Sequence, residues 1–262
     1  MFTVHCIIDK TVIPLVYALL PNKRQETYTK VFRQLKQIKP ALSPVSVLSD
    51  FEQAIINSIK DCFPDTRIRG CFFHFSQCIW REIQRNSPIC DKYKDIQDPD
   101  FSLYLRQLAA LAFVPEEDVI ECFNVLLDSD FFRENEQLLC PLIDYIEDQW
   151  IGRPTRSATG RRSPRVPISL WNCYEASIDD LPKTNNSIEG WHRSFSSLMA
   201  SSNPNFWRFL EILKKEEGLT RLKLEQLTSG INPPPSKRIY IETARIFWSD
   251  TSYYEISYYE DK

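Results

Sequence analysis

The segment VSVLSDFEQA, residues 45–54, predicts a strand, an acidic residue and a helix in direct succession. Residues 45–48 are mostly apolar and predict a short strand, while residues 51–63 repeat apolar side chains at helical spacing. Asp50 then lies just past the carboxyl end of a strand, where open α/β sheets place their functional groups. The same arrangement suits a helix N-cap, so Asp50 has a structural as well as a metal-binding interpretation.

Regular elements surround this segment on both sides. Alternating apolar side chains over residues 2–8 predict a strand, and a nearly continuous apolar run over residues 12–20 predicts a central strand buried on both faces. The short interval between these runs predicts a hairpin. A helix is expected over residues 25–38, a strand over residues 66–73 and a helix over residues 76–85.

The pattern changes after about residue 90. Residues 101–150 contain helical segments and no convincing strand, which favours an α/β core interrupted by a helical insertion. A further helix is expected over residues 206–227, with a break at Gly218 as an alternative. The expected domains are residues 1–90 (first part of the core), 91–170 (helical insertion and basic loop), 171–228 (closing helices of the core) and 229–262 (a tail).

Composition narrows the class of protein. The 262 residues are 43% hydrophobic, enough for a sizeable core, and the net charge of −3 is not the basic footprint of a typical nucleic-acid-binding domain. The eight cysteines have irregular spacings and follow no signal peptide, which indicates a reducing compartment rather than a disulfide framework. No stretch approaches 18 apolar residues, so a membrane partner is not expected.

A second acidic residue lies at the edge of a predicted helix far along the chain. Residues 185–192 are NNSIEGWH, and Glu189 lies near the start of a helical pattern. Metal-dependent phosphodiester chemistry uses carboxylates brought together from distant segments, and their hard oxygen atoms suit Mg²⁺ and Mn²⁺. Asp50 and Glu189 are therefore candidate metal ligands, and the alternative for Glu189 is a solvated helix residue.

Several segments together resemble the transposase domain of Mutator-like elements, the MULE family, over roughly residues 1–215. The matching segments are FTVH (2–5), IPLVYALLPNK (13–23), residues 28–35, LSDFEQA (48–54), GCFFHF (70–75), WIG (150–152), WN (171–172) and TNNSIEGWH (184–192). The Asp-Phe-Glu and Asn-Asn-x-x-Glu-Gly-Trp-His segments are specific in combination, whereas each alone is weak.

The MULE resemblance implies an RNase H-like α/β core, a mixed sheet flanked by helices, with an all-helical insertion before the last acid. It also implies an Asp-Asp-Glu triad that holds two divalent ions, Mg²⁺ or Mn²⁺. On that pattern Asp50 is the second acid and Glu189 the third, while the first belongs on a strand ahead of Phe2. Asp9 falls at the hairpin turn and is not expected to replace it. The core is thus expected to be N-terminally truncated, and this chain by itself is expected not to cleave DNA.

The activity that the resemblance implies is DNA cleavage at transposon ends, followed by strand transfer into target DNA, in the nucleus. Transposon ends and target DNA are the expected partners, and a homo-oligomer is a further expectation. The alternative is a domesticated, non-catalytic module that binds DNA or protein.

Secondary site residues have open interpretations. Cys71 and His74 match the family's Cys-x-x-His pattern, but zinc is not expected because a structural zinc site needs four ligands; packing beside the active site is preferred. His192 could contact phosphate, orient a carboxylate or be a buried, satisfied histidine. Residues 151–170 carry five arginines and no acid, and they are interpreted either as a DNA-contacting segment or as a solvated loop. The arginines of this basic segment are Arg153, Arg156, Arg161, Arg162 and Arg165.

Overall fold

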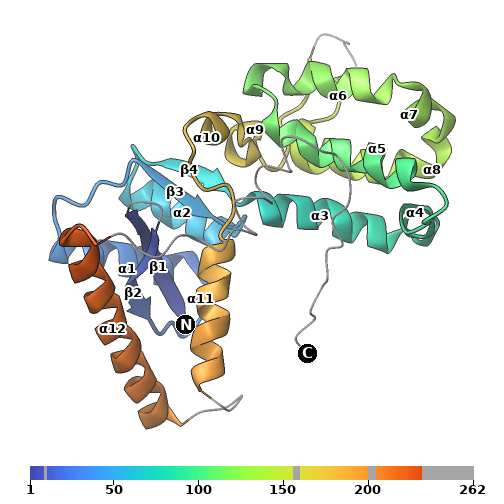
Figure 1. Ribbon diagram of the computed structural model, residues 1–262. Helices are drawn as coiled ribbons and strands as arrows, with labels where there is room; N and C mark the ends of the chain where they lie inside the picture. Colours follow the sequence, from blue (N-terminus) through green and yellow to red (C-terminus); the bar gives the residue numbers. More distant parts are fainter. Residues whose placement is uncertain (9–10, 156–159, 200–204, 232–262) are drawn as a thin grey trace. The chain divides into compact units, whose positions relative to one another are not determined.

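The computed structural model describes residues 1–8, 11–155, 160–199 and 205–231 and shows a mixed α/β protein (Figure 1). Its strands form two two-stranded sheets, β1 (Phe2–Ile8) with β2 (Thr11–Ala18), and β3 (Ser46–Ser49) with β4 (Arg67–Gly70). The α/β class is therefore confirmed. Within the described residues the strands pair as two separate sheets.

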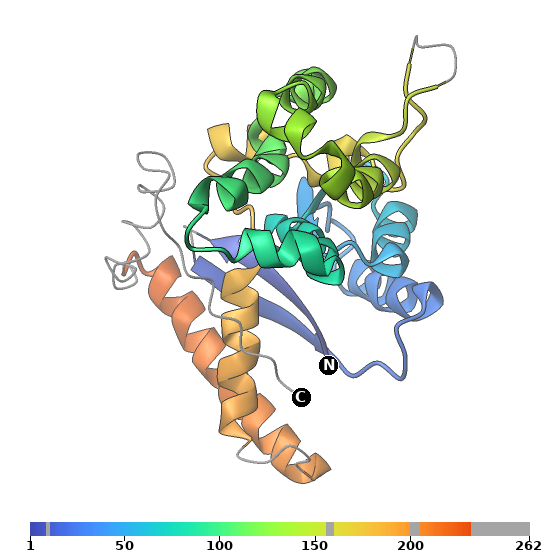
Figure 2. The same cartoon turned by 90° about the vertical axis from the view of Figure 1, so that its right-hand side faces the viewer.

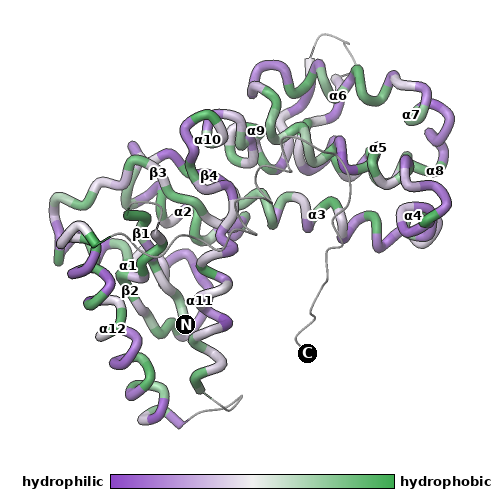
Figure 3. Tube along the Cα trace, in the orientation of Figure 1, coloured by the Kyte–Doolittle hydropathy of each residue, from purple (hydrophilic) through white to green (hydrophobic). Residues whose placement is uncertain are grey.

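The β1–β2 sheet confirms the predicted hairpin, because so short an interval allows only antiparallel pairing. The prediction that the second strand is buried on both faces is met only in part. Adjacent residues of a strand face opposite sides, and Ile13 and Pro14 are both buried, whereas Leu15 is 52% exposed. Figure 3 shows β2 largely in the hydrophobic colour, although most of its residues are only partly buried.

The β3–β4 sheet is parallel, and α2 (Gln53–Cys62) connects its strands. The register pairs Ser46 with Arg67 and Ser49 with Gly70, so both strands end at the same level. The predicted strand over residues 66–73 is therefore too long. Residues Asp50 and Cys71, which follow the last pair, come to lie at one edge of the sheet.

Helix α1 (Gln25–Ile38) has the predicted bounds and packs against α2. The helices bury a small apolar core whose central members are Tyr28, Phe32, Ile59, Cys62 and Phe63. Side chains of β1, β3 and β4 pack against the same core, among them Val4, Val47 and Ile68. This core holds β3 in place and thereby positions Asp50.

Helix α3 (Phe72–Arg85) starts four residues earlier than predicted. Phe75, Ile79 and Ile83 face a larger core at helical spacing, and each is at most 3% exposed. Burial of Phe75, which stacks on Trp171 with ring centroids 4.6 Å apart, favours extending the helix back towards β4. His74 consequently lies in the first turn of a helix, and Cys71 is the N-cap residue.

The segment after α3 is helical throughout, as predicted for residues 101–150, and its helices gather around the larger core (Figure 1, Figure 2). Its α-helices are α4 (Ser87–Tyr93), α5 (Pro99–Ala110), α6 (Val119–Leu127), α7 (Asp130–Glu134) and α8 (Glu136–Ile146). Single turns at Leu111–Phe113, Glu116–Asp118 and Glu147–Ile151 join or extend them.

Four helices complete the described chain: α9 (Ile168–Trp171), α10 (Tyr174–Ile178), α11 (Asn186–Leu198) and α12 (Phe206–Thr228). Helix α12 runs without a break through Gly218, because nothing in the structure interrupts it there. In the described part of the chain, none of the helices combines the length and apolar composition needed to cross a bilayer.

The chain folds as two compact units. One comprises Met1–Val4 and Val16–Ser194, and it contains Asp50, Cys71, His74 and Glu189. The other comprises His5–Leu15 and the chain from Phe195 onward. All the residues of the candidate site described below lie within the first unit.

Candidate functional site

The edge of the β3–β4 sheet brings Asp50 and Cys71 together. The backbone N–H of Cys71 donates a hydrogen bond to the carbonyl of Ser49 at 2.9 Å, which continues the parallel ladder by one residue. The Cys71 side chain is fully buried, whereas the carboxylate of Asp50 is 46% exposed. The site therefore has a fixed, buried sulfur beside an accessible carboxylate.

Asn185 ties both residues to the segment before α11. Its Nδ2 donates to Asp50 Oδ1 at 2.9 Å, and the Cys71 thiol donates to its Oδ1 at 3.1 Å. Close by, the backbone N–H of Phe72 donates to the carbonyl of Lys183 at 2.8 Å. These bonds attach residues 183–185 to the start of α3, although the two segments are more than 110 positions apart in the sequence.

Asn185 is a site residue that sequence reasoning missed. Its place before a helix suggests an N-cap, yet its side chain binds Asp50 and Cys71 instead. The signal that could have found it is its position in the NNSIEGWH segment, which carries the family resemblance. Periodicity alone contains no information about this role, because both contacts are long-range.

His74 lies between two carboxylates. Its Nδ1 is 3.1 Å from Asp50 Oδ1, and its Nε2 is 3.9 Å from Glu189 Oε1. The shorter contact lacks hydrogen-bond geometry, so Nδ1 is buried without a hydrogen-bond partner. The structure therefore brings together both predicted acids, Asp50 and Glu189, around the histidine of the Cys-x-x-His pattern.

The thiol of Cys71 is protonated at neutral pH in this environment. Burial raises its pKa, and the negative charge of Asp50 adds to the rise. Hydrogen bonds to the sulfur, including one from the backbone of His74, oppose this effect without outweighing it.

The acid that follows Asp50 in the chain is engaged elsewhere. Tyr28 donates to Glu52 Oε1 at 2.9 Å, and burial together with this bond raises the pKa of Tyr28 to about 12. Lys23 lies 3.8 Å from the other oxygen of Glu52. Glu52 thus helps to hold α1 against α2.

His192 contacts a different part of the first unit. Its Nε2 is 3.0 Å from Thr3 Oγ1, and its ring meets the ring of Trp191 at 4.9 Å between centroids. Burial lowers the pKa of His192, and the N-terminal ammonium lowers it further. This environment favours a neutral histidine that is satisfied by its surroundings over one that orients Asp50 or Glu189.

Among the described residues, one group offers three potential metal-ligand atoms in close proximity. The group is Asp50, Cys71 and His74, whose ligand atoms all lie within 4.8 Å of one another. The residues supply one oxygen, one sulfur and one nitrogen. Glu189 flanks the group through its contact with His74.

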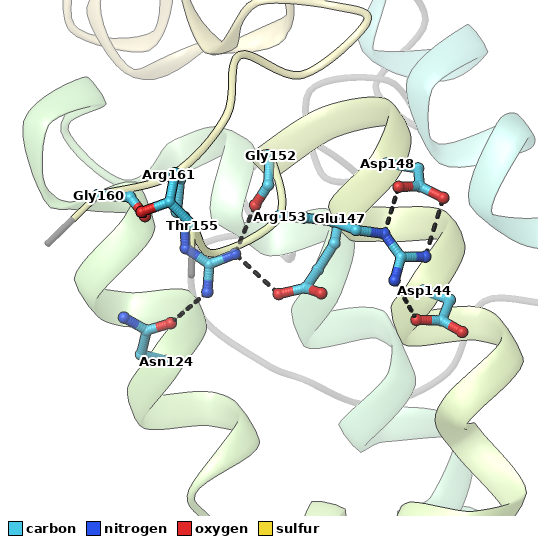
Figure 4. A network of polar contacts seen from close by, with 9 residues as sticks. All are labelled: Asn124, Asp144, Glu147, Asp148, Gly152, Arg153, Thr155, Gly160 and Arg161. Carbon is cyan, nitrogen blue, oxygen red and sulfur yellow. Dashed lines mark hydrogen bonds and ion pairs between the residues drawn. The ribbon is translucent and has the colours of Figure 1, made fainter. Parts of the chain in front are cut away.

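Arg153 and Arg161 of the basic segment form contacts within the protein (Figure 4). The Nε and Nη2 atoms of Arg153 both donate to the Asp148 carboxylate, the Nη2 bond having a length of 2.9 Å. Its Nη1 lies 3.0 Å from Asp144 Oδ1. The guanidinium group holds the pKa of Asp148 below its usual range. Arg153 thus anchors the start of the loop to the end of α8.

Arg161 is the more buried of the two. Its guanidinium donates to Glu147 at 2.8 Å, to the Gly152 carbonyl at 2.6 Å and to Asn124 at 2.7 Å, as Figure 4 shows. It also lies over the Phe123 ring, 5.4 Å from its centroid. All these partners lie in the helical region, so Arg161 braces the loop.

The other arginines of the basic segment have different positions. Arg162 and Arg165 form no ion pair with a residue that the structure describes. Arg156 lies outside the described residues. Arg162 and Arg165 therefore remain the better-placed candidates for phosphate contacts.

The comparisons with known proteins concern the N-terminal part of the chain. Residues 1–78 match the family model of the MULE transposase domain. The matched segment includes Asp50, Cys71 and His74 and ends before Asn185 and Glu189. Neither a curated protein nor a solved structure matches the chain significantly.

Proposed function

Residues 1–78 belong to the MULE transposase domain family, and from this premise we propose that the chain is a transposase domain built for metal-dependent cleavage and strand transfer of DNA at transposon ends. A transposase-type function follows from the family. The chemistry at individual residues is our proposal.

One observation supports this proposal most directly: the contacts of Asp50 and His74 with the segment that carries Glu189. Asn185 reaches Asp50 across 135 positions of sequence, and Glu189 lies one turn further along the same segment. Two acids from distant elements thus flank one histidine. Phosphodiester chemistry on divalent ions requires such convergence.

The two acids fit a hard divalent cation. Both side chains are about one third to one half exposed, so their oxygens are open to solvent and to a phosphate. Asp50 and Glu189 would hold Mg²⁺ or Mn²⁺, which when bound stabilises negative charge on phosphate oxygens and activates the attacking oxygen. Asn185 keeps the Asp50 carboxylate in one orientation.

The MULE resemblance implies three acids. We propose that Asp50 and Glu189 are the second and the third of them. The alternative is a non-catalytic DNA-binding or protein-interaction module, and the experiment below distinguishes the two.

The proposed partners follow from the same chemistry. Transposon ends and target DNA are the substrates, the nucleus is the site of action, and a homo-oligomer would pair two ends. With a net charge of −3, attraction to DNA has to come from local groups such as Arg162 and Arg165 rather than from the whole protein.

The test combines DNA binding with nicking in Mg²⁺ and Mn²⁺, using plasmid DNA and the chain with Asp50→Asn or Glu189→Gln. The matched control is Glu52→Gln, which alters a nearby acid but keeps an oxygen acceptor for Tyr28. Metal-dependent nicking that both site variants abolish and the control retains would establish an enzyme.

Other outcomes are equally decisive. Salt-dependent DNA binding without nicking, unchanged by Asp50→Asn, would establish the non-catalytic module. Absence of both binding and nicking would refute a DNA function for this chain.

A further inference from the structure

The ligand group at the sheet edge is chemically mixed. A site for Mg²⁺ needs oxygen ligands, yet Asp50 is joined by a thiol and an imidazole within 4.8 Å. Sulfur and nitrogen ligands select softer cations such as Zn²⁺ and Co²⁺. We propose that Asp50, Cys71 and His74 form a binding site for one zinc-class cation.

The backbone pre-arranges the three ligands. Cys71 is the N-cap of α3, and His74, three residues later, lies above the same side of its first turn. Asp50 is brought to Cys71 by the parallel register that ends at Ser49 and Gly70. Each ligand therefore projects from the edge of a regular element, which limits the conformational entropy lost on binding.

The distances are close to those of a tetrahedral site. Bonds of about 2.0–2.3 Å from zinc to nitrogen, oxygen and sulfur place ligand atoms roughly 3.3–3.6 Å apart. Asp50 Oδ1 and His74 Nδ1 are 3.1 Å apart, and all three ligand atoms lie within 4.8 Å. Side-chain shifts of about 1 Å close the remaining gap.

The surroundings of His74 complete the argument. Its Nδ1 is buried and has no hydrogen-bond partner, which leaves a lone pair directed at the group when Nε2 carries the proton. Nε2 lies 3.9 Å from Glu189, close to the position of a carboxylate that orients a metal-bound histidine. A water molecule would then be the fourth ligand.

This site shares Asp50 with the proposed catalytic acids. A zinc-class ion bound there occupies Asp50 and displaces Mg²⁺, so it would act as an inhibitor. The inhibition rests on the proposed function. The binding of the cation does not, because it is measured without DNA.

The experiment is a titration of the reduced, metal-stripped full chain with Co²⁺, followed by displacement with Zn²⁺. We expect one equivalent of Co²⁺ to produce the near-ultraviolet absorption of a cobalt–thiolate bond. Cys71→Ser should abolish this band, and His74→Gln should weaken Co²⁺ binding at least tenfold. The control is Cys140→Ser, because Cys140 also lies beside a carboxylate, at 3.8 Å from Asp144, but is exposed and far along the chain.

A thiolate band that persists in Cys71→Ser, or a Co²⁺ affinity unchanged in His74→Gln, would overturn the proposal and leave Cys71 and His74 as packing residues. If circular dichroism shows that Cys71→Ser does not fold, the partly exposed His74 decides the question. Excess Mg²⁺ should not displace the Co²⁺ band, and easy displacement would also count against a soft-ligand site.

Discussion

At the scale of single residues, Asn185 links the two halves of the candidate site. One amide serves the Asp50 carboxylate as a donor and the Cys71 thiol as an acceptor, through its nitrogen and its oxygen respectively. A buried thiol and a half-exposed carboxylate are thereby held side by side. Two further consequences at this scale can be measured.

Asn185→Ala removes both hydrogen bonds. Because Asp50 is half exposed and can bind water instead, we expect a stability loss of only about 1 kcal/mol by urea denaturation. Co²⁺ affinity, in contrast, should fall clearly, since Asp50 loses its fixed orientation. Asn57→Ala removes comparable hydrogen bonds to Gln25 and Gln53 and should leave Co²⁺ affinity unchanged. Equal Co²⁺ affinities for both variants would contradict the role of Asn185.

The cysteines should differ sharply in reactivity. Burial raises the pKa of Cys173 to about 11, and Arg69 and Lys183 only partly oppose the rise. Below that pKa the thiolate, which is the nucleophile, is scarce, and the side chain is 3% exposed. With iodoacetamide at pH 8, mass spectrometry should show Cys140 modified first and Cys173 only after unfolding. Early modification of Cys173 in the folded protein would refute this assignment.

At the scale of elements, packing explains where strands and helices end. Gly70 closes β4 directly beneath the Phe51 ring, where an added Cβ would lie 2.4 Å from a ring carbon and 3.0 Å from the Leu170 carbonyl. The close approach brings Phe51 and hence Asp50 against the sheet edge. The absence of a side chain at Gly70 thus allows the Phe51 ring to pack directly against the end of β4.

Gly70→Ala should destabilise the protein by about 1–3 kcal/mol, because the sheet edge has to shift to admit the methyl group. Gly218→Ala is the matched control. Gly218 lies inside α12 with open space around it, so alanine should stabilise the helix by about 0.5–1 kcal/mol. Thermal unfolding of both variants measures the difference, and a neutral Gly70→Ala would show that Phe51 moves freely.

The ion pairs of Arg153 and Arg161 with residues of the helical segment differ in burial. Arg161 and Glu147 are only 13% and 14% exposed, whereas Arg153 and its partner Asp148 are close to half exposed. Removing one member of a largely buried pair costs about 3 kcal/mol or more, whereas a solvent-exposed pair adds little stability. Urea denaturation should therefore show Arg161→Met to be much more destabilising than Arg153→Met. The opposite order would mean that Arg161 is not a structural residue.

At the scale of the whole molecule, the balance of charge determines how DNA can be bound. The net charge of −3 gives no general attraction to phosphate, and two of the basic-segment arginines pair with acids. On the proposed function, DNA binding would draw on exposed cations such as Arg162 and Arg165. The larger apolar core lies in the helical region, so these cations project from a well-supported part of the first unit.

Arg162→Ala and Arg165→Ala should weaken DNA binding with little effect on stability. Each lost phosphate contact reduces the slope of log affinity against log salt by about 0.9. Fluorescence anisotropy at several NaCl concentrations measures this slope for each variant and for both together. A slope unchanged in the double variant would place the DNA contacts elsewhere on the protein.

The sequence by itself determined the features that depend on neighbouring residues: the hairpin, the bounds of α1, the strand–Asp50–helix order and the all-helical segment after residue 90. Hydrophobic periodicity encodes these because it acts over a few residues. Only the tertiary structure decided that Ser49 pairs with Gly70, that Asn185 binds Asp50 and Cys71, and that Arg161 is buried. These contacts join residues that are distant in sequence, and their energies depend on register and burial, which no local pattern specifies.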